Sequence, residues 1–174
     1  MSNNWRISSF SGALLAGYFI PTWAMVAFNI MVSPIHSFYE RPNIAVALFM
    51  SDHLQLAGMA MVRMAWLLAL GKIMAVVFFV IFLVFLTRAA IRKTGGADEA
   101  LAIALSIGSV ISFASMVMAS RVGETAALQL HATELLMLLG TAIVMVVERP
   151  ATPAAANPAA VDLALEQPQL LDNR

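Results

Sequence analysis

The fold is decided by residues 65–87, AWLLALGKIMAVVFFVIFLVFLT, in which Lys72 is the one charged side chain. A helix needs about 20 apolar residues to cross the hydrocarbon of a bilayer, so this segment predicts a membrane span. Arg88, Arg92 and Lys93 follow directly. Basic residues beside a span mark its cytoplasmic side, so the loop that they occupy is predicted to be cytoplasmic.

The composition of the whole chain agrees with a membrane protein. Of its 174 residues, 61% are hydrophobic and 11% are charged, whereas soluble domains have about 25% charged residues. The formal net charge is zero and the sequence has no basic block, so it lacks the positive surface that a nucleic-acid binder needs. It has no cysteine, which excludes disulfides and thiolate metal sites within the chain.

Together with the segments before and after residues 65–87, the sequence predicts an all-α fold: a polytopic integral membrane protein with a four-helix transmembrane bundle. The predicted spans are residues 11–32, 65–87, 99–120 and 125–147, and residues 44–64 are predicted to form an additional outer interfacial or re-entrant helix. In an alternative with five spans, residues 44–64 also cross. That alternative places Asp52, His53 and Arg63 in hydrocarbon, where each central charge costs about 2.5–3.5 kcal/mol, so four spans are favoured.

The orientation follows from the basic loop. Counting from it places both termini in the cytoplasm and residues 33–64 outside, in what we expect to be a bacterial inner (plasma) membrane. The first ten residues are interpreted as the start of a retained first helix, because no small-residue cleavage pattern follows them. Residues 1–148 form the predicted transmembrane domain. Residues 149–174 form a predicted flexible tail, rich in proline and alanine.

Three ionisable residues lie inside the predicted spans: Lys72, His131 and Glu134. His131 and Glu134 are three positions apart and so share a helix face, and Lys72 is predicted to lie at a similar depth, about 10 Å inside. Ionisable side chains in a membrane face the bundle interior and find partners. Two interpretations stay open: a buried ion pair that fixes helix register, or a site that handles protons or ions or binds a cofactor.

The predicted outer loop supplies a second group of candidates: His36, Glu40, Asp52 and His53. They could bind a metal together with nearby methionine sulfurs, but their spacing matches no ligand motif, and no metal is expected. A b-type haem would need two histidines at one depth. Only His131 lies firmly within a span, and His53 could reach it only if residues 44–64 dip inward. Haem or quinone therefore stays a possibility, and no cofactor is the expectation.

One face of the third predicted span carries only small residues: Ala104, Gly108, Ser112, Ser115 and Ala119. Small faces let membrane helices approach closely. This face is interpreted as packing within the bundle or, alternatively, as an interface for another subunit.

Recognisable catalytic motifs are missing from the sequence: no metalloprotease, nucleophile-elbow, phosphate-loop or dinucleotide pattern is present. The favoured function is therefore a non-enzymatic membrane subunit or assembly partner of a larger, possibly energy-converting complex. Its expected partners are the lipid bilayer and other membrane subunits, or further copies of the chain. A proton- or ion-coupled transporter or channel that uses Lys72, His131 and Glu134 is the alternative, and a haem- or quinone-binding anchor is the third hypothesis.

Overall fold

The computed structural model describes residues 6–88 and 95–148, and within those ranges the regular structure is entirely helical. Four helices are long and apolar enough to cross a membrane. They are α1 (Ile7–Val32), α4 (Met59–Thr87), α6 (Gly96–Val122) and α7 (Thr125–Val147), and two short helices, α2 (Pro34–Phe38) and α3 (Ile44–Asp52), lie between the first two. The predicted all-α bundle with four spans is confirmed. The predicted tail, together with Arg92 and Lys93, lies outside the described residues.

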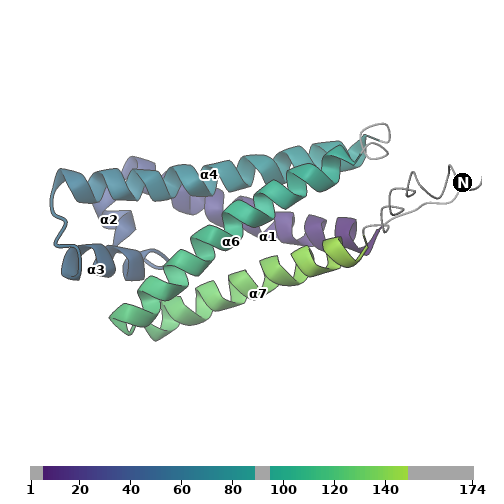
Figure 1. The fold of residues 1–174 in the computed structure, drawn as a ribbon. Helices are drawn as coiled ribbons and strands as arrows, with labels where there is room; N and C mark the ends of the chain where they lie inside the picture. Colours follow the sequence, from purple (N-terminus) through teal and green to yellow (C-terminus); the bar gives the residue numbers. More distant parts are fainter. Residues whose placement is uncertain (1–5, 89–94, 149–174) are drawn as a thin grey trace, which may run out of the picture.

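The four long helices separate at one end of the bundle, and the two short helices fill the gap. Figure 1 shows α6 running beside α4 at one end and crossing to α7 at the other, with α2 and α3 in the space that opens between them. α3 packs on α6, and α2 packs on α1 and α4. We call residues 33–58, which carry α2 and α3, the plug.

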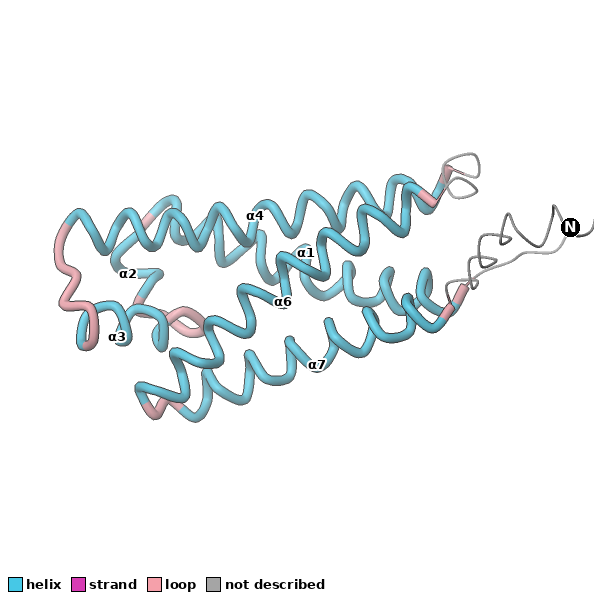
Figure 2. Tube along the Cα trace, in the orientation of Figure 1, coloured by secondary structure: helices cyan, strands magenta, loops and turns pink. Residues whose placement is uncertain are grey.

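The plug differs from the predicted interfacial helix over residues 44–64. α3 ends at Asp52, a loop follows, and α4 already begins at Met59, as the pink connection in Figure 2 shows. At nine residues, α3 is less than half the length that a crossing requires. Phe38, Ala45 and Ala47 are fully buried, so the plug packs inside the bundle end and does not rest on its surface.

The boundaries of the other helices are close to those predicted. The fourth span is observed at the predicted residues, and the first and third are each a few residues longer than expected. α6 ends at Val122, and the residue after it, Gly123, has a left-handed φ of 78°, a conformation that glycine adopts without strain. This turn reverses the chain directly into α7.

Polar contacts join three helix ends at the opposite side of the bundle. Glu148, which follows α7, accepts hydrogen bonds from the backbone amides of Ile7 (2.8 Å) and Ser8 (2.9 Å). These amides belong to the first turn of α1, where they have no partner within the helix and where negative charge is favoured. Arg6 forms an ion pair of 2.8 Å with Asp98 in the first turn of α6. Hydrogen bonding by Ser8, then by Ile7, lowers the pKa of Glu148.

We predict that Glu148→Gln lowers the thermal stability of the protein at neutral pH. Because the pKa of Glu148 is lowered in the folded state, its stabilising effect is fully present above the ordinary glutamate pKa. The effect is lost as the pH falls through the lowered value. The difference in melting temperature between the two proteins in detergent should therefore shrink toward acid pH. A difference that stays constant down to pH 3 would contradict this.

The contact of α1 with its neighbours depends on the lack of a side chain at Gly12. A Cβ built at this position would lie 2.8 Å from a Leu101 methyl carbon and 3.0 Å from the Phe82 ring, and both side chains are fully buried. Gly17, on the same helix, has no atom within 4 Å of a built Cβ. Gly12 therefore sets how closely α1 approaches α4 and α6.

We predict that Gly12→Ala destabilises the protein by about 1–3 kcal/mol, the usual cost of overpacking a core. Gly17→Ala is the matched control, because it makes the same substitution on the same helix where space is free. Unfolding by sodium dodecyl sulfate in mixed micelles measures both. Equal stabilities of the two variants would contradict the close approach at Gly12.

Candidate functional site: a buried polar network

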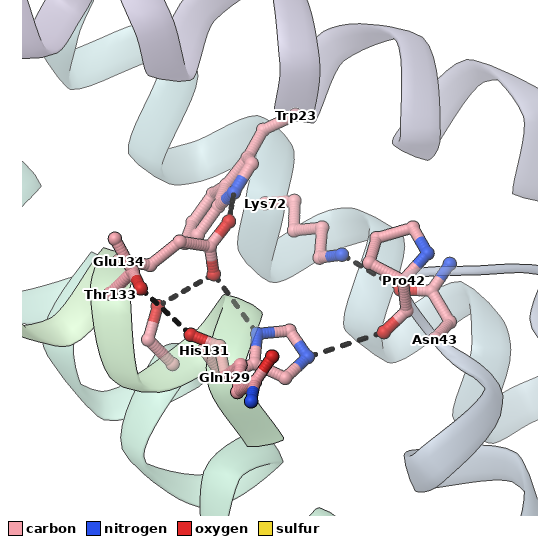
Figure 3. Close-up of polar contacts among 9 residues, drawn as sticks. Trp23, Pro42, Asn43, Lys72, Gln129, His131, Thr133 and Glu134 are labelled. Carbon is pink, nitrogen blue, oxygen red and sulfur yellow. Dashed lines mark hydrogen bonds and ion pairs between the residues drawn. The ribbon is translucent and has the colours of Figure 1, made fainter. Parts of the chain in front are cut away.

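Glu134 is the centre of a group of polar contacts inside the bundle (Figure 3). It accepts hydrogen bonds from the indole Nε1 of Trp23 (3.1 Å) and from the hydroxyl of Ser112 (3.3 Å). Its Oε2 atom also lies 2.9 Å from Nδ1 of His131, one turn earlier on α7. Glu134 and His131 are 4% and 3% exposed. Three spans, α1, α6 and α7, thus meet at one carboxyl group.

His131 connects this carboxyl group to the plug. Its second ring nitrogen, Nε2, lies 3.2 Å from the backbone carbonyl oxygen of Pro42. Both nitrogens of the buried imidazole are therefore engaged, one by a side chain of α7 and the other by the loop between α2 and α3.

Lys72 reaches the next residue of the same loop. Its ammonium donates a hydrogen bond of 2.8 Å to Oδ1 of Asn43, and the Asn43 amide donates to the carbonyl of Ser37 (3.3 Å). The ammonium also lies 5.7 Å from the centre of the Trp23 ring, a distance at which the face of an aromatic ring attracts a cation. Lys72 is 2% exposed. Trp23 thus contacts both charged groups, with its ring near Lys72 and its N–H on Glu134.

The three predicted ionisable residues thus belong to one network, but they do not all contact one another directly. The ion pairs among the described residues are Arg6–Asp98, His36–Glu40 and His131–Glu134, so Lys72 is bonded to Asn43 and not to Glu134. α4 begins at Met59, which places Lys72 thirteen residues along it, about 20 Å from its start. Lys72 is therefore farther from the start of its helix than the sequence predicted, because α4 begins earlier.

The partners of His131 determine how many protons the pair holds. The Pro42 carbonyl can only accept a hydrogen bond, so Nε2 must carry a proton to bond to it. An ionised Glu134 also only accepts, so one more proton must lie between Nδ1 and Oε2. The pair therefore holds two protons, either as imidazolium with carboxylate or as neutral imidazole with carboxylic acid. In both forms the pair is neutral overall, which lowers the cost of its burial.

All buried polar side-chain atoms have partners within the described residues. Every buried side-chain nitrogen and oxygen atom there forms at least one hydrogen bond. Buried polar groups cost free energy unless they are bonded, and more so in a membrane. The network is complete in this conformation, so loss of one proton or one partner leaves a specific group unsatisfied.

The network lies next to a cavity at the plug end and next to an apolar core on the other side. A cavity of about 130 Å³ at the plug end is lined by residues that include Arg41, Pro42 and Glu124, and Arg41 is exposed. Pro42 therefore lies between this cavity and His131. On the other side, an apolar core begins one helical turn beyond the network, at residues that include Leu138. Phe19 stacks on Phe79 within this core. The core separates the network from the other end of the bundle.

The outer candidates form no common site. His36 and Glu40 pair with each other at 2.9 Å and are exposed, while Asp52 accepts from Ser51 and His53 stacks on Phe49. Within the residues that the structure describes, no group of three or more histidine, aspartate or glutamate side chains could hold a metal ion. His53 is exposed and His131 is buried, so the two are not arranged as a haem pair, and both nitrogens of His131 already have protein partners.

The small-residue face of α6 packs within the chain. Its five residues, Ala104, Gly108, Ser112, Ser115 and Ala119, are all buried. A Cβ at Gly108 would lie 3.3 Å from Leu138 and 3.8 Å from the Trp23 ring. The face lets α7 and Trp23 approach α6, and it brings Ser112 to Glu134.

Three members of the network, Trp23, Pro42 and Asn43, were not identified from the sequence. Trp23 lies well inside α1, although tryptophan in membrane proteins favours the interfaces. An internal tryptophan whose N–H needs a partner was therefore a usable signal. The Pro42–Asn43 pair gave no such signal, because loop residues at an interface are ordinarily polar.

Comparisons with known proteins were made at the level of sequence and of structure. No protein-family model, curated protein or solved structure matches the chain. No family is assigned. The function is therefore inferred from the site itself.

We predict that Asn43→Leu destabilises the protein by about 1.5–3 kcal/mol, the usual contribution of a hydrogen bond to a charged group. The substitution leaves the Lys72 ammonium buried without its oxygen acceptor. Replacing both partners with apolar groups of similar size removes that penalty, so Lys72→Met combined with Asn43→Leu should cost less than Asn43→Leu alone. Denaturant titration in mixed micelles measures the free energy of unfolding of the wild type, the two single variants and the double variant. Additive costs would mean that the two side chains are not coupled.

Proposed function

We propose that this integral membrane protein is a small proton transporter in which the His131–Glu134 pair binds the proton. The observation that carries the proposal is that side chains from two spans hold adjacent residues of the plug, His131 at Pro42 and Lys72 at Asn43. A change in the protonation of the pair therefore acts on the segment that closes one end of the bundle. Ionisable residues inside membrane spans commonly mark proton relays.

Loss of one proton from the pair has a defined consequence. The proton that remains on His131 is held best at Nδ1, because a hydrogen bond to a carboxylate is stronger than one to a neutral carbonyl. Nε2 then presents a lone pair to the Pro42 carbonyl oxygen, and the contact at 3.2 Å becomes repulsive. The pair itself changes from neutral to a net negative charge. The repulsion at Nε2 favours release of the plug at residue 42.

The seal on the opposite side fits a transporter better than a permanently open channel. The apolar core beyond the network separates it from the other end of the bundle, whereas the Arg41–Glu124 cavity lies next to Pro42. Transporters of this kind expose their binding site to the two sides of the membrane in turn. In this conformation the cavity at the plug end reaches Pro42, whose carbonyl contacts His131.

Proton movement in liposomes tests the function. We predict that the purified chain, reconstituted with a trapped pH dye and driven by a potassium diffusion potential, moves protons faster than protein-free liposomes. Glu134→Gln should reduce the rate to that of protein-free liposomes, because an amide cannot take up the proton. Glu99→Gln, an exposed glutamate on α6, is the matched control and should keep the wild-type rate. Equal rates for the wild type and Glu134→Gln would contradict the proposal.

Thiol labelling tests the movement of the plug. The chain has no cysteine, so one introduced at Ile44, which lines the cavity beside Pro42, is the unique target of a water-soluble maleimide. We predict that its labelling rises with pH more steeply than that of a reference cysteine at the exposed Thr125, which corrects for thiol ionisation. In the Glu134→Gln background the ratio should not depend on pH. A pH-independent ratio in the otherwise wild-type chain would contradict a proton-linked plug.

The accessory-subunit function remains a second proposal. It is supported by the lack of catalytic motifs in the sequence and by the proline- and alanine-rich residues 149–174. The small-residue face gives it no support, because α7 and Trp23 already cover that face. A native mass spectrum of the gently extracted protein distinguishes the two proposals. Stable foreign subunits would favour the accessory role, and the chain by itself or with its own copies would favour transport.

A further inference from the structure

A groove on the outside of the bundle runs along α4 and is separate from the polar network. It encloses about 660 Å³. Its lining is almost entirely apolar and includes Met31 of α1 and Trp66, Leu67, Leu70 and Ile73 of α4, with Arg63 as the one charged residue. Met31, Trp66, Leu67 and Leu70 are about half exposed. The groove therefore faces the surroundings of the bundle.

The position of Arg63 along α4 places it at the level of lipid headgroups. Arg63 lies 25 residues before Arg88, which ends α4, so the two are about 37 Å apart along the helix. A bilayer with its headgroup regions is about 40–45 Å thick, so each arginine reaches the polar region of a different leaflet. Trp66 lies about one turn deeper than Arg63, where interfacial tryptophans are favoured.

The length of the groove matches one leaflet. Its lining on α4 runs from Met59 to Ile73, which is 14 residues or about 21 Å of helix. The part from Arg63 to Ile73 covers about 15 Å, and half of the hydrocarbon thickness is also about 15 Å. The groove thus begins at headgroup depth and ends near the middle of the bilayer. Its one cation stands at the headgroup end, and the rest of its lining is apolar.

We propose that this groove is a binding site for an anionic phospholipid, with the phosphate on the Arg63 guanidinium and one acyl chain along Trp66, Leu70 and Ile73. No hydrogen bond or ion pair within the described residues uses the Arg63 side chain. A guanidinium presents paired N–H groups that match two phosphate oxygens. Anionic headgroups add attraction to a cation at the membrane surface. The charge and the shape of the groove both fit this one occupant.

Native mass spectrometry of the purified full chain in detergent tests the site. Phosphatidylglycerol and phosphatidylcholine with identical acyl chains are titrated separately. Arg63→Gln should weaken the first phosphatidylglycerol binding step about fivefold, the contribution expected of one arginine at a membrane surface, and should reduce the preference over phosphatidylcholine. Arg121→Gln is the control, because Arg121 is exposed in the last turn of α6, at the same end of the bundle. It should leave that first step unchanged.

A second variant tests the apolar part of the groove. Leu70→Trp fills the groove from an exposed position and should weaken the binding of both lipids, while elution from a sizing column stays that of the wild type. Equal phosphatidylglycerol affinity of Arg63→Gln and Arg121→Gln would overturn the headgroup assignment. Unchanged lipid binding by Leu70→Trp would overturn the groove assignment. A protein subunit found on this face in native extracts, in place of lipid, would also overturn the proposal.

Discussion

The structure depends on two bonds that hold adjacent loop residues from opposite sides. His131 of α7 bonds to the Pro42 carbonyl, and Lys72 of α4 bonds to the Asn43 side chain. The spans that carry these two residues separate at this end of the bundle, and the plug fills the space between them (Figure 1). Without the loop, a buried ammonium and a buried imidazole nitrogen would lack partners in a medium that supplies no water.

Both apolar and polar contacts hold the plug in place. Phe38, Val46, Ala47 and Met50 pack against side chains of α1 and α4, and α3 also packs on α6. Hydrophobic burial drives association weakly inside a membrane, because lipid tails are as apolar as the side chains. Interhelical hydrogen bonds and close packing contribute correspondingly more. We therefore expect the plug to respond to the protonation of His131, which it contacts.

Much of the fold could be predicted from the sequence, because membrane spans are read from length and hydropathy alone. The segment at residues 65–87 and the basic residue Arg88 identified the end of α4 correctly. The start of α4 was predicted at residue 65 and is observed at Met59, because the charge of Arg63 marks the end of the apolar run and not the start of the helix. Residues 44–64 divide into α3, a loop and the start of α4. This division depends on tertiary packing, which the hydrophobic periodicity of the sequence does not reveal.

The ionisable residues of the candidate site could be predicted from the sequence, but their hydrogen-bond partners could not. Burial in a span forces Lys72, His131 and Glu134 to find partners, so their presence in one interior network follows from their chemistry. That Lys72 would bond to Asn43 depends on how deeply the loop enters the bundle. No local pattern encodes that depth. Trp23 joins the two charges because α1 passes between α4 and α7, an arrangement that only the three-dimensional fold defines.

The most direct test of the proton-linked plug is solid-state NMR of the full chain in lipid bilayers, with ¹⁵N in histidine and ¹³C in the proline carbonyls. A His131→Asn variant assigns the His131 signals among the three histidines. We predict that Nε2 is protonated at neutral pH, because it bonds to the Pro42 carbonyl, and that any change of the Nε2 signal with pH is accompanied by a shift of the Pro42 carbonyl signal. An unprotonated Nε2 at neutral pH, or a Pro42 carbonyl signal that stays fixed while the Nε2 signal shifts, would contradict the coupling of the proton site to the plug.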